Sequence, residues 1–110
     1  MVHDSFAVSE ELILAFQQDN NVNLKFIEAG DTGTAVNKAV LSKNAPLADV
    51  FYGLDNTFLS RALDEEIFER YESPLLRDIP DTFKLDPNYY VLPVDYGDIC
   101  LNLYFIIKPI

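Results

Sequence analysis

The feature that most limits what this chain can fold into is an alternation of short apolar segments with stretches of helical periodicity. The apolar segments 24–28 and 49–53 are each followed by a loop containing glycine and aspartate, and then by a helical pattern. Val2 is all that is present of an earlier apolar segment, so we expect the chain to begin late in a strand. Strand, loop and helix in this order predict an α/β fold, a mainly parallel sheet with flanking helices.

Local signals place three helices. Ser9 is a good N-cap, and the two glutamates after it suit a first helical turn, so a helix is expected over about 10–18. Apolar residues recur at helical spacing over 34–42, which predicts a second helix. A third is expected to begin near Thr57.

The second half of the chain has a different character. Residues 72–89 carry three prolines and are expected to be mostly irregular. The apolar runs 91–94 and 99–107 are expected to be further strands. Pro93 cannot donate a ladder hydrogen bond, so the first of these runs is expected at an edge or interrupted.

Composition narrows the classes of partner. The 110 residues fit one domain, and 18 acidic against 8 basic residues give a formal charge of −10. The 49% hydrophobic content argues against disorder, which pairs high charge with low hydrophobicity. The acidity argues against nucleic acid, because phosphate binding needs a basic stripe. It is compatible with a cationic small molecule.

Several chemistries are excluded by what the sequence lacks. Cys100 is the single cysteine and His3 the single histidine, which excludes an intrachain disulfide and the multi-cysteine and two-histidine metal sites. No stretch reaches the ~20 apolar residues of a membrane span, and no signal peptide is expected. The neighbours His3, Asp4 and Ser5 are set aside as catalytic, because adjacent residues of an extended segment point to opposite faces. We therefore expect a chain that is not an enzyme and holds no metal or cofactor.

Three loops are candidates for a binding site, because ligands of open α/β sheets bind outside the carboxyl ends of the strands. They span 30–33, 53–56 and 95–98, and each combines glycine with aspartate. Tyr52 and Tyr96 stand beside two of them. Carboxylates and aromatic faces suit a cation. Glycine and aspartate are also the commonest turn residues, so a purely structural interpretation stays open.

Four motifs occur in a familiar order: HDSF at 3–6, AGDTG at 29–33, PLADVFYGLDNTFL at 46–59 and PVDYGDICLN at 93–102. Together they resemble the thiamine-type substrate-binding proteins of ABC transporters, in the iron/thiamine/polyamine branch of the type II periplasmic binding fold. The resemblance implies one α/β lobe of a two-lobed protein. It also implies capture of thiamine or its phosphates in the periplasm, or at the outer face of the membrane, and delivery to the permease subunits. Iron(III), a polyamine or another cation stays open as the solute.

The resemblance also assigns ligand-binding roles to single residues. Asp31 matches the acidic residue with which the family meets its cationic ligand. His3 stands where the family often has an aromatic residue, and Asp55 lies in the loop that borders the cleft. The last two residues of the set lie where the chain leaves this lobe. The set is His3, Asp4, Ser5, Asp31, Thr32, Asp55, Asn56, Asp95 and Tyr96.

The chain departs from the family after Asn102. We expect residues 1–110 to form a single, incomplete N-terminal lobe, with 99–110 as a crossing or edge strand that would lead to a missing second lobe. A lone lobe buries too little of a ligand, so thiamine binding is expected to be weak or absent. The exposed apolar edge predicts a homodimer or a strand-swapped dimer. The alternative is a truncated acidic α/β domain that binds no ligand and associates with itself through this edge.

Overall fold

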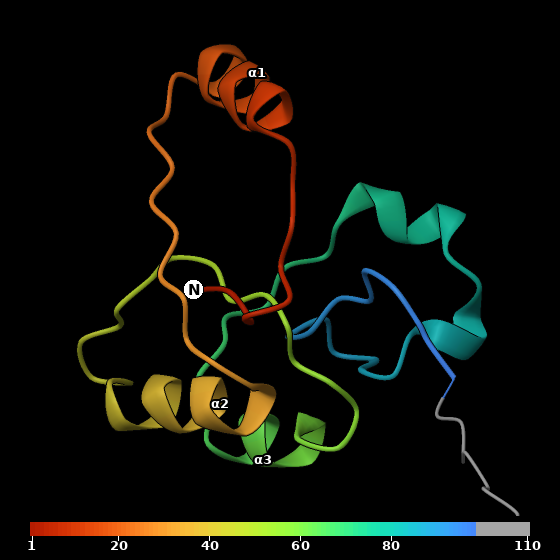
Figure 1. Cartoon of the computed structure of the whole chain (residues 1–110). Coiled ribbons are helices and arrows are strands. Elements are labelled where there is room, and N and C mark those ends of the chain that lie inside the picture. The colour runs from red at the N-terminus through yellow and green to blue at the C-terminus, as the bar shows by residue number, and fades with distance from the viewer. Residues whose placement is uncertain (99–110) are drawn as a thin grey trace, which may run out of the picture. The chain divides into compact units, whose positions relative to one another are not determined.

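The chain divides into two compact units, Met1–Arg70 and Tyr71–Ile110. The structure is a computed structural model and describes residues 1–98. Residues 99–110 lie outside the described residues, and with them the expected crossing or edge strand and Cys100. The elements are the helices α1 (Glu10–Asn20), α2 (Thr32–Leu41) and α3 (Leu59–Asp64) in the first unit, and the 3-10 helices η1 (Pro74–Asp78) and η2 (Asp81–Phe83) in the second (Figure 1).

The prediction of a mainly parallel sheet with flanking helices is wrong. Within residues 1–98 the apolar segments pair only as isolated parallel bridges, from Val2 to Glu28 on one side and to Tyr52 on the other. Asp4 and Ser5 form a turn directly after Val2 and His3, so this segment offers too few residues for a ladder. Five backbone hydrogen bonds of 2.9–3.1 Å hold the three segments together. The N–H groups of Val2, His3 and Asp4 donate to the carbonyls of Ile27, Tyr52 and Gly30. In return, the N–H groups of Ala29 and Tyr52 donate to the carbonyls of Val2 and Met1.

The other expected strand within the described residues is also absent. Residues 91–94 pair with no strand in the part of the chain that the structure describes. Instead, the N–H groups of Tyr90 and Val91 donate to the carboxylate of Asp86. A loop that uses its amides in this way cannot use them for a ladder.

The three predicted helices are confirmed, with shifted ends. Helix α1 has the expected N-cap, since Ser9 Oγ accepts the Leu12 N–H at 3.4 Å, and it ends at Asn21 in the left-handed region with a φ of 51°. Helix α2 begins two residues earlier than expected because Asp31 is its N-cap. Helix α3 begins two residues later than expected, because the N–H groups just before it donate to Asp55.

Helix α1 buries none of its residues. It stands at the end of two extended segments, away from α2 and α3 within the first unit (Figure 1). Leu12 and Phe16, which lie four residues apart and so share a face, are 63% and 50% exposed. Within the first unit, the amphipathic pattern that predicted this helix therefore has no partner surface.

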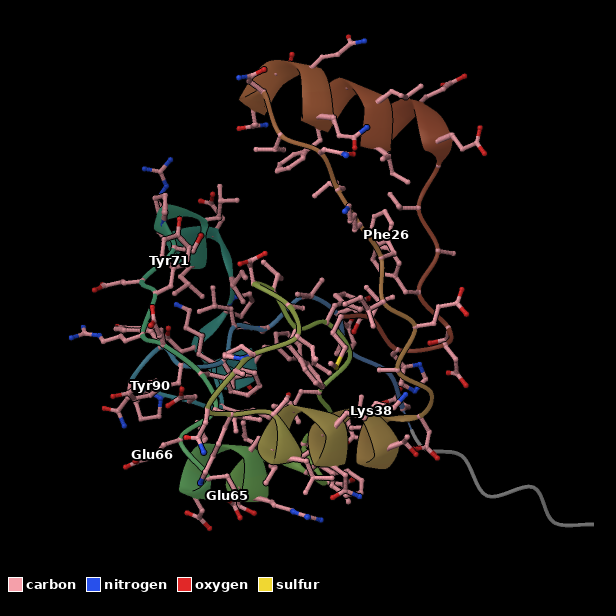
Figure 2. All side chains as sticks on the ribbon, turned by 90° about the vertical axis from the view of Figure 1, so that its left-hand side faces the viewer. Phe26, Lys38, Glu65, Glu66, Tyr71 and Tyr90 are labelled. Carbon is pink, nitrogen blue, oxygen red and sulfur yellow. The ribbon has the colours of Figure 1, made fainter. Side chains whose placement is uncertain are left out.

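The core of the first unit is small and centres on α2. Val36 is fully buried, and Met1, Ala29 and Ala35 form one cluster against which Phe51 packs. The Lys38 ammonium donates to the carbonyl of Ala29 at 3.1 Å, which ties α2 to the paired segment (Figure 2). Helix α2 thus contributes Ala35, Val36 and the Lys38 hydrogen bond to this core.

The second unit is organised by one buried carboxylate. Asp86 is 5% exposed and accepts the backbone N–H groups of Asn88, Tyr90 and Val91 at 2.7–3.0 Å. As expected, residues 72–89 form no long element, only the two 3-10 helices and turns. A single side chain thus replaces the regular hydrogen bonding that a strand would have supplied.

Substituting Val36→Ala should lower the free energy of unfolding by about 2 kcal/mol, because it leaves a cavity where no side chain can fill the space. Thermal unfolding followed by circular dichroism measures this. Leu75→Ala is the matched control, since Leu75 is 66% exposed and its truncation should be nearly neutral. Equal losses in the two variants would contradict the placement of the core.

Substituting Asp86→Ala should release the 88–91 loop, at a cost of roughly 2–3 kcal/mol for the buried N–H groups that lose their acceptor. Amide hydrogen exchange at Asn88, Tyr90 and Val91 should accelerate. Asp78→Ala is the control, because Asp78 is largely exposed and meets only Arg77, at 3.8 Å. Unchanged exchange at all three amides would show that Asp86 does not hold the loop.

Candidate functional site

The turns after the three parallel segments lie together, because parallel segments end on the same side. The Asp4 N–H donates to the carbonyl of Gly30 at 3.1 Å, and Thr32 Oγ1 donates to the carbonyl of Gly53 at 3.0 Å. These two bonds join the first turn to the second and the second to the third. The group so formed, here called the turn cluster, consists of His3, Asp4, Ser5, Asp31, Thr32 and Gly53.

His3 is at the centre of the first turn. Its Nδ1 lies 2.8 Å from Asp4 Oδ1 and 2.8 Å from Ser5 Oγ, and it accepts the Ser5 N–H at 3.0 Å. The expectation that these neighbours point to opposite faces is wrong, because the chain turns at Asp4 and Ser5. A neutral ring with an unprotonated Nδ1 accepts from Ser5, whereas a protonated Nδ1 donates to Asp4.

This arrangement is not that of a catalytic triad. In a triad the serine and the aspartate bond to different nitrogens of the imidazole, so that the proton passes from one side to the other. Here Ser5 and Asp4 both approach Nδ1 of His3. The three side chains can bind a polar ligand, but they lack the relay that would activate the hydroxyl.

Asp31 is exposed and caps α2, accepting the Thr34 N–H through Oδ1 at 2.7 Å. This backbone hydrogen bond is the main cause that lowers the pKa of Asp31 below its ordinary value, and the nearby His3 acts in the same direction. A lowered pKa keeps the carboxylate charged throughout the neutral range. The stabilisation that it gives the helix is present above a pH of roughly 4 and is lost as the pH falls below that.

Two members of the turn cluster have structural rather than ligand-facing positions. Thr32 is 8% exposed and its hydroxyl donates to Gly53, so it fixes one turn to the next. Gly53 has a φ of 105°, and a Cβ built on it would lie 2.4 Å from the Cβ of His3. Only glycine allows the third turn to approach the first this closely. The sequence signal for this contact is the glycine itself, although a glycine in a turn does not by itself indicate a close approach.

The two other predicted residues of the first unit, Asp55 and Asn56, lie outside the turn cluster. Asp55 Oδ1 accepts the N–H groups of Thr57 and Phe58 at 2.9 and 3.2 Å, so the carboxylate serves the start of α3. Asn56 is exposed in the same loop. Asp95 and Tyr96 belong to the second unit, where the Tyr96 ring stacks on Phe83 with centroids 4.6 Å apart.

The second unit has a cavity of about 470 Å³ that sequence reasoning missed, because the region was set aside as irregular. Arg77, Asp81, Lys84 and Tyr89 are among its lining residues. Lys84 donates to Asp81 at 2.7 Å, and this bond is the main cause that lowers the pKa of Asp81. Within this lining, Asp81 and Lys84 therefore satisfy each other's charge.

No family model matches the chain, and neither a curated protein nor a solved structure does so. Among residues 1–98, no three side chains of His, Cys, Asp or Glu are grouped so that they could hold a metal ion. The same residues contain no helix with the length and apolar character needed to cross a membrane.

Substituting Gly53→Ala should disrupt the turn cluster, at a cost of about 1–3 kcal/mol, because the new methyl group collides with His3 and the residue is held at positive φ. The NMR signals of the His3 ring should shift, which a purely local strain at residue 53 would not cause. Gly97→Ala is the control, since a Cβ there meets nothing within 4 Å. An unmoved His3 signal would contradict the close approach.

Proposed function

We propose that the chain is the solute-binding part of an ABC importer, and that its turn cluster captures a cationic organic solute, thiamine or a thiamine phosphate. The observation that carries this proposal is the meeting of Asp4 and Asp31 with His3 on neighbouring turns. The motifs at 3–6 and 29–33 that resemble the thiamine-type proteins supply these same residues.

The chemistry of the turn cluster suits a cation. Asp31 uses Oδ1 for the helix cap, and its exposed carboxylate carries a full charge at neutral pH. The Asp4 side chain is 63% exposed and can turn toward a ligand when it is not paired with His3. Both carboxylates act by charge, so iron(III) or a polyamine remains a competitor for the same position.

Binding at such a site is expected to be weak. Each ion pair formed in solvent contributes at most about 1 kcal/mol. A dissociation constant of the order of 1 mM corresponds to about 4 kcal/mol, which two such pairs and partial burial of one ring can supply. The proposed role needs no catalysis and no cofactor. It places the chain in the periplasm or at the outer face of the membrane, where the permease receives the solute.

The competing proposal is an acidic domain that binds no ligand and associates with itself. Its basis in the sequence is the apolar run 99–107, expected as an edge strand, which lies outside the described residues. A separate observation favours self-association, namely the exposed apolar side chains along α1. The two proposals differ in what they expect from a titration with thiamine.

Titration of the chain with thiamine to several millimolar should shift the amide signals of residues 3–5, 30–32 and 53, with a dissociation constant of the order of 1 mM. Asp31→Asn should weaken binding about threefold, because asparagine still caps α2 but removes the charge. Asp19→Asn is the matched control. It removes the same charge from an exposed position on α1, and it should leave the constant unchanged.

Two outcomes would count against this proposal, and a third against the affinity expected of it. If thiamine shifts no signal, the competing proposal of a ligand-free domain stands. If Asp19→Asn weakens binding as much as Asp31→Asn, the attraction belongs to the net charge of the chain and not to the turn cluster. A sub-micromolar constant for the monomer would overturn the expectation that so open a site binds weakly.

A further inference from the structure

Nδ1 of His3 has more partners than one ring nitrogen can serve at the same time. Asp4 Oδ1 and Ser5 Oγ each lie 2.8 Å from it, and the Ser5 N–H donates to it at 3.0 Å. The Ser5 N–H needs a lone pair on this nitrogen, whereas a carboxylate oxygen at such a distance needs a proton on it. The two sets of contacts therefore belong to two protonation states of one ring.

The neutral ring with its proton on Nε2 is the state that suits Ser5. Nδ1 then accepts from the backbone N–H of Ser5 and from its hydroxyl. The lone pairs of Nδ1 and of Asp4 Oδ1 face each other in this state and repel. Because the Asp4 side chain is 63% exposed, it is free to turn away from the ring. The neutral state thus leaves the Asp4 carboxylate available to a cation.

The protonated ring is the state that suits Asp4. Nδ1–H donates to Asp4 Oδ1 in a hydrogen bond that both charges strengthen, and the Ser5 N–H loses its acceptor. The pair neutralises the charge of Asp4, and the imidazolium adds a positive charge to the turn cluster. Both effects oppose the binding of a cationic solute.

The segments beside His3 carry three other carboxylates. Asp31, on the second turn, is near enough for His3 to help lower its pKa, although its backbone hydrogen bond is the main cause. Asp55 is turned to the start of α3, and Glu28 is exposed. Carboxylates titrate near roughly pH 4, below the range of about pH 5 to 8 in which histidine changes its charge. The third turn meets His3 with Gly53, which carries no charge.

Two cationic groups lie on the elements packed around the same segment. Lys38 of α2 donates to the Ala29 carbonyl at 3.1 Å (Figure 2), and the Met1 ammonium donates to the Val50 carbonyl at 2.6 Å. Burial lowers the pKa of the Met1 ammonium, so this group also changes its charge toward neutral pH. A test of His3 has to separate its titration from that of Met1.

We propose that His3 is a positioning residue for Asp4, and that its protonation decides whether Asp4 is available to the cationic solute. The neutral ring holds Ser5 and frees Asp4, whereas the protonated ring takes Asp4 as its partner. The role in solute capture rests on the proposed function, but the exchange of partners at Nδ1 does not.

Removing each partner should move the titration midpoint of the His3 ring in opposite directions. Asp4→Asn removes the partner of the protonated ring, so the midpoint should fall by about 0.5 pH unit. Ser5→Ala removes the hydroxyl that favours the neutral ring, so the midpoint should rise by a similar amount, about 0.5 unit. The ring proton on Cε1 reports the midpoint by NMR without ambiguity, because His3 is the single histidine.

Two further signals complete this measurement. Asp19→Asn is the matched control, since it removes the same charge from an exposed position on α1 and should leave the midpoint unchanged. The Ser5 amide signal should move with the midpoint of the ring, because protonation takes away its acceptor.

Thiamine titrations of the chain at pH 6 and pH 7.5 test the role in capture. The dissociation constant, followed at the amides of residues 30–32, should be roughly threefold higher at the lower pH, because Asp4 is then paired. His3→Asn is the matched variant. Its amide oxygen accepts the Ser5 N–H but does not titrate, so the two constants should become equal. This variant retains Met1, which separates the two titrations.

The outcomes decide the two parts separately. A midpoint that Ser5→Ala leaves unmoved, or that both substitutions move in the same direction, overturns the exchange of partners. Equal thiamine constants at both pH values overturn the role in capture and leave the proposed function intact. A pH dependence that persists in His3→Asn overturns it too, because it belongs to Met1 or to the solute. If thiamine shifts no signal at either pH, the proposed function fails and the regulation of capture with it, and the midpoints alone decide the exchange of partners.

Discussion

The structure of the first unit depends on the backbone of residues 1–4. On one side, the Val2 N–H donates to the Ile27 carbonyl and the Val2 carbonyl accepts the Ala29 N–H. On the other side, the His3 N–H donates to the Tyr52 carbonyl and the Met1 carbonyl accepts the Tyr52 N–H. Three segments far apart in the sequence are thereby held parallel with very few hydrogen bonds. Every later feature follows from this, because parallel segments bring their turns to one end, and there the candidate ligand-binding side chains lie.

The turns themselves are fixed by small, specific contacts and not by burial. Gly53 allows the third turn to approach His3, and Thr32 joins it to the second turn. The capping bond of Asp31 fixes one carboxylate at the start of α2 and keeps it charged. A site built in this way is open to solvent, which explains both its capacity to attract a cation and the weakness expected of that attraction.

The distribution of apolar residues separates the two proposals for this molecule. A small core around Val36 holds α2 in place, whereas α1 keeps Leu12 and Phe16 in contact with water. Exposed apolar surface of this extent costs free energy, and association is the process that removes it. Solute capture and self-association use different residues, so separate substitutions can test them.

The sequence by itself determined the three helices, because their signals are local. Ser9 and Asp31 are caps that act within a single turn, and helical spacing of apolar residues needs no distant partner. It also determined that carboxylates and glycines stand at the ends of apolar segments.

Only the tertiary structure decided whether those segments join into a sheet, because a ladder needs partners from other parts of the chain. Residues 4 and 5 turn away before such a ladder can extend. The structure likewise decided that His3, Asp4 and Ser5 face one another, while Asp55 serves its own helix, since the direction of a side chain in a turn depends on the path of the backbone.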